Sequence, residues 1–518
     1  MAHVDYHKKR FLIVEDHAEF RSSLKAMMRI FGAHQVDTAI NGEEAIAKII
    51  NNSYDIVLSD YELGKAKDGQ QILEETRRSG LLKSSSIFIL VTAASTVEMV
   101  MGALEYEPDG YITKPITHDN LKTRLDKIVQ EKILFKDVDR NIDQKKYKNA
   151  VIACNKIAKE HPKYQIKALR IKSKLLLNLE LYDDAEKLFE KIVQARELPW
   201  ARLGLGKIAY FKGEYDKALQ IFQQLADEDA RNVEAYDWLS KVYLSQNSPE
   251  EAQKALQHAV ERSPKSIIRQ MDLANISKTN SDWQVSEVAF RKSVNLGKNS
   301  CYKSPDNYTS LVQVLQDKIA NGGGRKTKDA STEALRTLDN LEKEYQDDEN
   351  VVIFSKVLRA ETSCSLGKEK ESEHILAGIA DKIKELENNM PEQMALSLAN
   401  VYDATGKKDE ANKLRSKYGQ TSANEVLNND GVRLFKNGQI KEALSVFSKA
   451  AKAPDASNSV LINALQATIK LMEKEGSDES LMNDCGQYMN KLDGLDSNDK
   501  NFMRYKKLSS AYDSFSNK

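Results

Sequence analysis

Polar side chains follow four short apolar runs in the N-terminal part of the chain. Asp60 ends one run, and Glu15 and Asp16, Thr92, and Lys114 follow the other three. In open α/β sheets, ligands bind at the carboxyl ends of the parallel strands. A carboxylate that attacks a phosphoryl donor gathers negative charge, which a hard cation and a lysine can offset. These residue types are therefore suited to phosphoryl transfer onto a carboxylate.

Strand-like and helix-like segments alternate over about residues 1–130 and would position these side chains. The alternation predicts a parallel five-stranded sheet with helices on both faces. Asn41-Gly42 could begin a hairpin, but the helical spacing of residues 43–50 favours a helix start. The strands are expected at about 10–14, 34–39, 55–59, 86–92 and 110–113.

The order of these residues resembles the receiver domain of two-component response regulators: an acidic pair, a lone Asp, a Thr and a Lys-Pro pair. The resemblance covers about residues 1–130 and implies a flavodoxin-like α/β fold. It implies that Asp60 accepts the phosphoryl group beside a bound Mg²⁺. The implied Mg²⁺ ligands are Glu15, Asp16, Asp60 and the backbone carbonyl of Glu62.

The same resemblance implies that Thr92 bonds one phosphoryl oxygen and that Lys114 pairs with another. Tyr111 would be the aromatic residue that changes rotamer, and the domain would be a phosphate-accepting switch rather than an enzyme. An α/β domain with ordinary capping acids and a buried lysine is the alternative.

The sequence departs from the receiver pattern in two places. The loop over residues 61–69 lacks the family's usual proline and is longer. Glu62 and Ala94 fall where receivers tune the lifetime of the phosphoaspartate. That lifetime therefore stays open, whereas phosphorylation itself is still expected.

The chain has 518 residues, with 77 Lys and Arg against 77 Asp and Glu. This length predicts roughly two to four structural units. The balanced charge argues against general binding to nucleic acids or anionic membranes. With only 9 Pro and 23 Gly, the composition is typical of a mostly helical protein.

The four cysteines are far apart and lack metal-ligand spacing, which fits a reducing cytoplasm. The polar N-terminus does not resemble a secretory signal, and no apolar run approaches the ~18 residues of a transmembrane helix. A soluble, cytoplasmic protein is therefore expected. The glycine-rich segment 321–327 lacks the spacing of a phosphate-binding loop, so a mobile loop is expected there.

Beyond residue 130, small residues recur about every 34 positions, each followed four positions later by a larger one. A small residue lets paired helices approach closely, and the larger one fills the groove against the next repeat. This pattern resembles tetratricopeptide repeats, with an irregular helical bundle as the alternative. The small residues are Ala150, Ala185, Ala218, Ala252 and Ser286, and the larger ones are Cys154, Phe189, Phe222, Leu256 and Phe290.

Four divisions of the chain are expected. They are a receiver over 1–130, tetratricopeptide-like repeats over 131–300, irregular helical repeats with a glycine-rich loop over 301–390, and further repeats with capping helices over 391–518. Because no Gly or Pro lies between Ile116 and His161, the last receiver helix is expected to continue into the first repeat. That helix would have roughly 25 residues, about 38 Å. Poor helix formers at 137–141 could open a turn instead.

Lys174, Lys207 and Lys241 hold equivalent positions in successive repeats, and Asn275 follows in the next. This position faces the groove of tetratricopeptide arrays. The resemblance therefore implies a cationic ladder for an acidic or carboxylate-ended segment of a partner. A set of solvated lysines is the alternative.

Together, these features predict a response regulator of a two-component phosphorelay. A histidine kinase or phosphotransfer protein would phosphorylate Asp60 and thereby modulate the protein–protein interactions of the repeat array. A phosphate sink that competes for the kinase's phosphoryl group is the alternative. A DNA-binding transcription factor is less favoured, because no basic recognition helix stands out.

Overall fold

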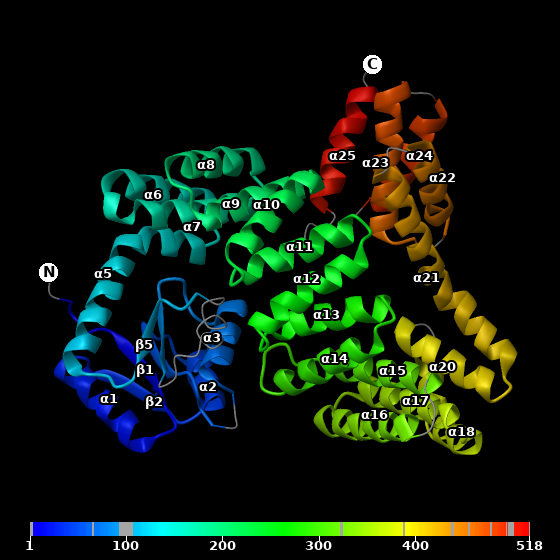
Figure 1. Cartoon of the computed structure of the whole chain (residues 1–518), viewed down its shortest axis with the longest axis horizontal. Helices are drawn as coiled ribbons and strands as arrows, with labels where there is room; N and C mark the ends of the chain where they lie inside the picture. Colours follow the sequence, from blue (N-terminus) through cyan, green and yellow to red (C-terminus); the bar gives the residue numbers. More distant parts are fainter. Residues whose placement is uncertain are drawn as a thin grey trace. The chain divides into compact units, whose positions relative to one another are not determined.

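The computed structural model divides into two compact units, residues 1–310 and 311–518 (Figure 1). The first unit holds an α/β domain and a run of paired helices, and the second unit is helical. The structure describes residues 4–64, 67–92, 107–321, 325–386, 389–436, 440–453, 456–476, 479–493, 495 and 502–516.

The α/β domain is built on a five-stranded sheet in the order β2-β1-β3-β4-β5. All four strand pairs are parallel, so every carboxyl end lies at the same edge. The predicted strand positions and parallel topology are confirmed. The strands are β1 (Arg10–Val14), β2 (Gln35–Ala39), β3 (Ile56–Asp60), β4 (Ile87–Thr92) and β5 (Gly110–Thr113).

Helices cover both faces of the sheet, because alternate residues of each strand point to opposite sides. Phe11 of β1 packs in one core with α1 and α5, whereas Leu12 packs in the other with α2 and α3. The predicted helix start at Asn41 is confirmed, since its side chain accepts a hydrogen bond from Glu44 N at 2.9 Å. The covering helices are α1 (Ala18–Ile30), α2 (Gly42–Asn51), α3 (Gly69–Arg78) and α5 (His118–Asp143).

Helix α5 belongs to two hydrophobic cores. Thr117 caps its first turn through Asn120 N at 3.3 Å, and the helix continues unbroken for 26 residues, about 39 Å at 1.5 Å per residue. Leu125 packs in the sheet core, whereas Val138 packs in the core of the first helix pair. The predicted continuous helix is therefore confirmed, and the segment 137–141 stays helical.

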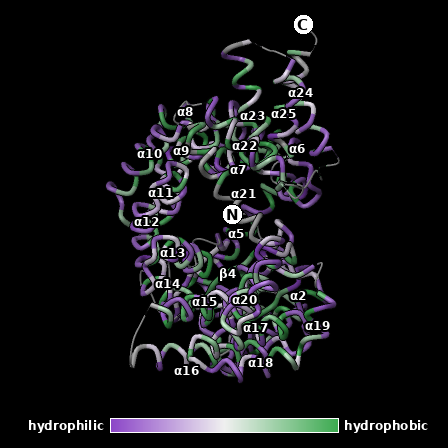
Figure 2. The backbone as a smooth tube through the Cα atoms, turned by 90° about the vertical axis from the view of Figure 1, so that its right-hand side faces the viewer, coloured by the Kyte–Doolittle hydropathy of each residue, from purple (hydrophilic) through white to green (hydrophobic). Residues whose placement is uncertain are grey.

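Antiparallel helix pairs follow α5. The predicted small residues, from Ala150 to Ser286, are all fully buried. At Gly206, an added Cβ would lie 2.6 Å from the ring of Phe222, so only glycine permits this approach of α9 to α10. Figure 2 shows apolar and polar residues mixed along the individual helices. The helices are α6 (Tyr147–Glu160), α7 (Gln165–Asn178), α8 (Tyr182–Ala195), α9 (Pro199–Phe211), α10 (Tyr215–Glu228), α11 (Val233–Ser245), α12 (Pro249–Arg262), α13 (Ile267–Thr279) and α14 (Trp283–Gly297).

The second unit begins within α15 (Pro305–Asn321) and repeats the same packing at its C-terminal end. There, an added Cβ at Gly431 would lie 2.6 Å from Phe447. The glycine-rich segment 322–324 lies outside the described residues. The helices are α16 (Arg325–Glu344), α17 (Glu349–Ser365), α18 (Glu369–Ala377), α19 (Ala380–Glu385), α20 (Glu392–Ala404), α21 (Lys408–Lys436), α22 (Ile440–Ala451), α23 (Asn458–Glu475), α24 (Glu479–Leu492) and α25 (Phe502–Ser516).

Asp139 gives the shared helix α5 a pH-dependent stability. The residue is only 7% exposed, and its burial raises the pKa from 3.8 to about 6, with Lys132 at 3.8 Å opposing the rise and the Asp109 charge adding to it. The folded chain therefore holds this proton more tightly than the unfolded chain. Its contribution to the free energy of unfolding is full below about pH 4 and is lost as the pH rises through about 6.

We expect Asp139→Asn to raise the free energy of unfolding near pH 7.5 by ~1–3 kcal/mol, because no buried carboxylate then ionises. The advantage should shrink toward about pH 5, as followed by urea unfolding with circular dichroism. Asp137→Asn is the matched control, since its side chain is 68% exposed. A destabilised Asp139→Asn near pH 7.5 would contradict the assignment.

Candidate functional site

Strand register brings the predicted residues to one edge of the sheet. Asp60 pairs with Val91 across β3 and β4, and Thr92 ends β4. Lys114 follows β5, where its backbone N–H donates to the Thr92 carbonyl at 2.7 Å. Residues far apart in the sequence therefore meet because parallel strands end together.

Lys114 joins the two buried carboxylates of the site. Its Nζ donates to Asp60 Oδ2 at 2.8 Å and to Glu15 Oε2 at 3.0 Å. The same Nζ lies 4.3 Å from the centre of the Phe20 ring, which covers it from α1. Asp60 is 7% exposed and Glu15 is fully buried, so both carboxylates depend on this cation.

Burial and pairing act in opposite directions on these groups. Burial raises the pKa of Glu15, whereas the hydrogen bond from Lys114 lowers it, and the net shift is upward. Burial lowers the pKa of Lys114, but its bonds to Asp60 and Glu15 outweigh this and leave it raised. Lys114 is therefore held in its charged form between the carboxylates.

Glu15, Asp16 and His17 place three potential metal ligands within 4.8 Å of one another. His17 Nδ1 lies 2.9 Å from Asp16 Oδ1. The loop after β3 passes beside them, since a Cβ added at Gly64 would be 3.8 Å from Asp16 Oδ2. With Asp60, this edge holds three carboxylates, of which Lys114 contacts Asp60 and Glu15. The surplus negative charge and the hard oxygen donors fit Mg²⁺.

Thr92 and Tyr111 lie on neighbouring strands at the same edge. Thr92 is buried at the end of β4, and Tyr111 stands on β5 opposite Leu90. Burial raises the pKa of Tyr111, and the Thr92 side chain opposes that rise. The two residues thus lie on adjacent parallel strands.

The four predicted groove residues lie on the first helices of successive pairs, α7, α9, α11 and α13. Lys174 and Lys207 form ion pairs at 2.5 Å with Glu107 and Glu234, respectively. Lys241 Nζ lies 4.4 Å from the centre of the Trp238 ring. Asn275 is exposed, and its carbonyl accepts from the Thr279 hydroxyl at 3.1 Å. The three lysines therefore already have partners within the chain.

Family comparisons match both parts of the first unit. The response regulator receiver domain matches residues 11–126, and two tetratricopeptide repeat profiles match residues 172–233 and 209–274. The chain carries a response regulator receiver domain followed by tetratricopeptide repeats. Its receiver is similar to the transcriptional regulatory protein DltR of Streptococcus agalactiae, 34% identical over 116 residues, which are 22% of this chain and 50% of DltR.

The receiver domain is also similar to the chemotaxis protein CheY-3 of Vibrio cholerae. The two are 29% identical over 121 residues, 23% of this chain and 92% of CheY-3. A CheY-like receiver from Methanospirillum hungatei is 27% identical with a TM-score of 0.22, covering 24% of this chain and 95% of that one. The chain spans about half the length of DltR, the first of these relatives.

Sequence reasoning missed two side chains of the site. His17 follows the acidic pair directly, and this adjacency was its only signal. Phe20 lies in α1 and covers Lys114, a contact that sequence spacing alone does not reveal. Ala94, predicted to tune the phosphoaspartate lifetime, lies outside the described residues, as do Lys65 and Ala66 of the loop after Asp60.

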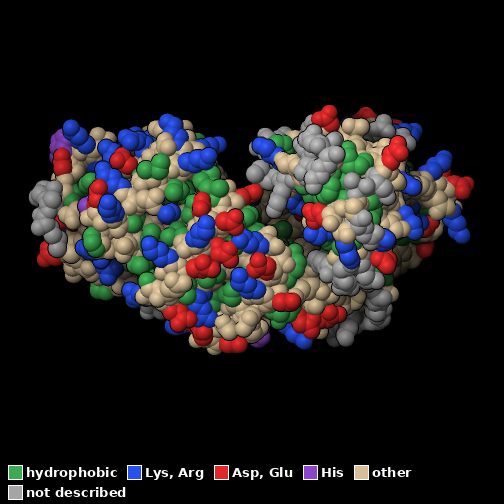
Figure 3. Space-filling model, turned by 90° about the horizontal axis from the view of Figure 1, so that it is seen from above, with side chains coloured by type: hydrophobic (Ala, Val, Ile, Leu, Met, Phe, Trp, Pro, Cys, Tyr) green, Lys and Arg blue, Asp and Glu red, His purple; other side chains and the backbone are tan. Residues whose placement is uncertain are grey.

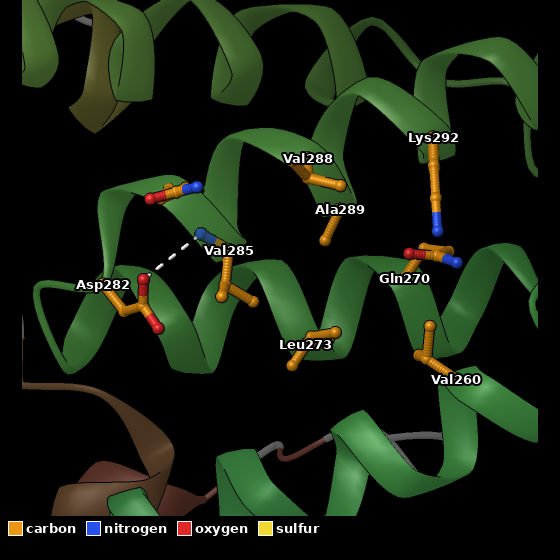
Figure 4. A pocket seen from close by; sticks show the side chains of 9 residues that line it. Val260, Gln270, Leu273, Asp282, Val285, Val288, Ala289 and Lys292 are labelled. Carbon is orange, nitrogen blue, oxygen red and sulfur yellow. Dashed lines mark hydrogen bonds between the residues drawn. The ribbon is translucent and has the colours of Figure 1, made fainter.

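A cavity of about 430 Å³ lies between α12, α13 and α14, and its lining comes only from the repeats (Figure 4). Val260, Leu273 and Val288 supply apolar walls, whereas Asp282 and Lys292 add opposite charges. Asp282 accepts a hydrogen bond from Val285 N at 3.2 Å, which caps α14. The cavity therefore takes no part in the carboxylate site.

On the face drawn in Figure 3, basic and acidic side chains are interspersed rather than gathered by sign. Among the described helices, none combines the length and the apolar character that crossing a membrane requires.

We expect calorimetric titration of the full chain with Mg²⁺ to show binding that Asp16→Asn weakens about tenfold or more, ~1.4 kcal/mol, through the loss of one anionic ligand. Glu15→Gln should weaken it as well. Asp119→Asn is the control, because that carboxylate is 98% exposed at the start of α5. Equal Mg²⁺ affinity in Asp16→Asn and the unaltered chain would remove Asp16 from the metal site.

Proposed function

We propose that this response regulator accepts a phosphoryl group on Asp60 and that phosphorylation changes the protein binding of its repeat array. The observation that carries the proposal is the bridge from Lys114 to Asp60 and Glu15 at the carboxyl edge of the sheet. Mg²⁺ would be held by Glu15, Asp16, Asp60 and the Glu62 carbonyl.

In the proposed reaction, a carboxylate oxygen of Asp60 attacks the phosphorus of a phosphohistidine on a histidine kinase or phosphotransfer protein. The new P–O bond forms as the P–N bond breaks, and the leaving imidazole nitrogen takes up one proton from solvent. Bound Mg²⁺ would offset the charge of the phosphoryl oxygens. Lys114 already lies 2.8 Å from Asp60 and would pair with a phosphoryl oxygen.

Phosphorylation replaces the single charge of the Asp60 carboxylate beside Lys114 with a phosphoryl group of about −1.5 to −2 charges. In the proposal, the Thr92 hydroxyl donates to a phosphoryl oxygen and moves toward it, and the Tyr111 ring turns into the vacated space. Thr92 ends β4 and Tyr111 lies within β5. Both strands contact α5. The change would thus reach the helix that continues into the repeats.

Asp109 supports this route from the receiver to the repeats. Its Oδ2 accepts from Phe88 N at 2.9 Å and from Arg77 at 2.8 Å, and its Oδ1 pairs with Lys132 of α5 at 3.0 Å. Asp143, at the other end of the same helix, accepts from Ser84 N at 2.7 Å. The receiver therefore holds α5 beyond the part that lies in its own core.

The proposed domains of the chain are 1–130, 131–300, 301–390 and 391–518. The groove of the repeats is the proposed output surface. The partner is a protein segment that carries negative charge. Lys174, Lys207, Lys241 and Asn275 are the candidate contacts. Their pairs with Glu107 and Glu234 would exchange for pairs with the partner.

The direct test measures intact mass after treatment with Mg²⁺ and a small phosphodonor. One added phosphoryl group is expected on the unaltered chain, with none on Asp60→Asn or in the presence of a chelator. Affinity capture with both proteins then tests the output. Equal capture by the phosphorylated chain and Asp60→Asn would favour a phosphate sink, and a full adduct on Asp60→Asn would exclude Asp60 as the acceptor.

A Gly-Ser segment inserted after Gln130 should uncouple the receiver from the repeats, because it interrupts α5 between its two cores. Coupling of ~1–3 kcal/mol between phosphorylation and partner affinity is typical of linked sites and should fall toward zero. The measurement is partner affinity with and without phosphodonor. An insertion of helix-forming Ala residues is the matched control for length. Unchanged phosphorylation dependence after the Gly-Ser insertion would contradict a rigid connection.

A further inference from the structure

Two cations of the repeat array converge on one carboxylate of the receiver. Lys174 Nζ lies 2.6 Å and 2.5 Å from the two carboxylate oxygens of Glu107, and Arg170 donates to one of them at 3.3 Å. Arg170 and Lys174 stand one turn apart on α7 and so share a face. The pair therefore holds a carboxylate from two sides.

Glu107 faces α7 from a backbone conformation that is uncommon for a non-glycine residue. Its φ of +48° lies in the left-handed region, which non-glycine residues seldom occupy, and Pro108 follows it. Burial raises the pKa of Glu107, but Lys174 and Arg170 together lower it by more. The net shift of the pKa is therefore downward. The carboxylate is therefore ionised at this contact.

The contact does not stand alone in the first unit. Arg78 of α3 lies 4.1 Å from the centre of the Tyr302 ring and donates to the Cys301 carbonyl at 3.3 Å. Lys265, between α12 and α13, lies 5.3 Å from the centre of the Tyr61 ring, next to Asp60 in sequence. Among the described residues, the receiver thus contacts the repeats at further places besides α7.

We propose that Arg170 and Lys174 form a carboxylate-binding site for an acidic segment of the partner, and that Glu107 fills this site while the partner is absent. The inference rests on the proposed function, whose partner class and regulation it specifies. Glu107 acts as an internal substitute for the partner's carboxylate.

Exposure of these groups makes the internal pair exchangeable. The side chains of Arg170, Lys174 and Glu107 are 50%, 51% and 54% exposed, and exposed ion pairs contribute only ~0.2–1 kcal/mol. Because Glu107 belongs to the same chain, it nevertheless competes at an effective concentration on the order of mM. An external carboxylate therefore binds weakly until Glu107 leaves.

The position of Glu107 links this site to phosphorylation. Glu107 lies four residues before Tyr111, and Asp109 between them is fixed to Arg77 and Lys132. A turn of Tyr111 therefore acts on the segment that presents Glu107 to α7. Aromatic contact is also available to the partner, since the Arg170 guanidinium lies 5.9 Å from the Trp200 ring.

The test is fluorescence anisotropy with the full chain and labelled short peptides, without phosphodonor. One peptide carries internal Glu residues and an amidated C-terminus, a second has a free C-terminal carboxylate and no Glu, and a third has Gln in place of Glu. Glu107→Gln should bind at least one carboxylate peptide about fivefold or more tightly than the unaltered chain. The two peptides show which kind of carboxylate the site takes.

Combining Glu107→Gln with Arg170→Gln and Lys174→Gln should remove the gain in peptide affinity. The Gln peptide should show no gain in affinity with Glu107→Gln. Glu190→Gln, at an exposed position of α8, is the matched control for loss of one negative charge. Circular dichroism checks that each variant is folded. The inference would be overturned if the Glu107→Gln variant bound neither carboxylate peptide more tightly than the unaltered chain does. Phosphorylation of Asp60 is measured separately, so its failure would instead overturn the proposed function.

Discussion

The bridge from Lys114 to two buried carboxylates is the interaction on which the candidate site depends. The strand order places β4 between β3 and β5, so Lys114 must reach past the end of β4 to Asp60. Thr92 stands at that end, which brings its hydroxyl beside the same carboxylate edge. Carboxylates buried without a cation would be strongly destabilising. A single lysine cannot neutralise three carboxylates. The remaining negative charge would favour binding of a divalent cation.

One short segment connects this site to the rest of the first unit. Over residues 107–111, Glu107 contacts α7, Asp109 contacts α3 and α5, and Tyr111 lies near Thr92. Helix α5 adds a second connection, because its two halves lie in different cores. Receiver and repeats are thus joined by a continuous helix and by side-chain pairs. In the proposed mechanism, the helix would transmit displacement, and the half-exposed pairs would exchange partners.

Much of the fold follows from local signals in the sequence. Apolar runs ending in polar residues predicted the strands, Asn41 predicted the start of α2, and the spacing from Ala150 to Ser286 predicted the helix pairs. Charge pairing between distant segments has no such signal. Lys174 was predicted to face a groove, but its partner Glu107 comes from the receiver. Likewise, the polar segment 137–141 resembled a possible turn, but it is helical and contains the buried Asp139. The sequence gives no signal for this burial, because it depends on the packing around α5.

The central claim is that chemistry at Asp60 changes what the repeats present. Hydrogen–deuterium exchange of the full chain, with and without a small phosphodonor and Mg²⁺, tests it most directly. The account predicts faster exchange after phosphorylation in the segment around Glu107 and in its contact helix α7, with no such change in Asp60→Asn. Complete phosphorylation of Asp60 with unchanged exchange both around Glu107 and throughout α7 would contradict it.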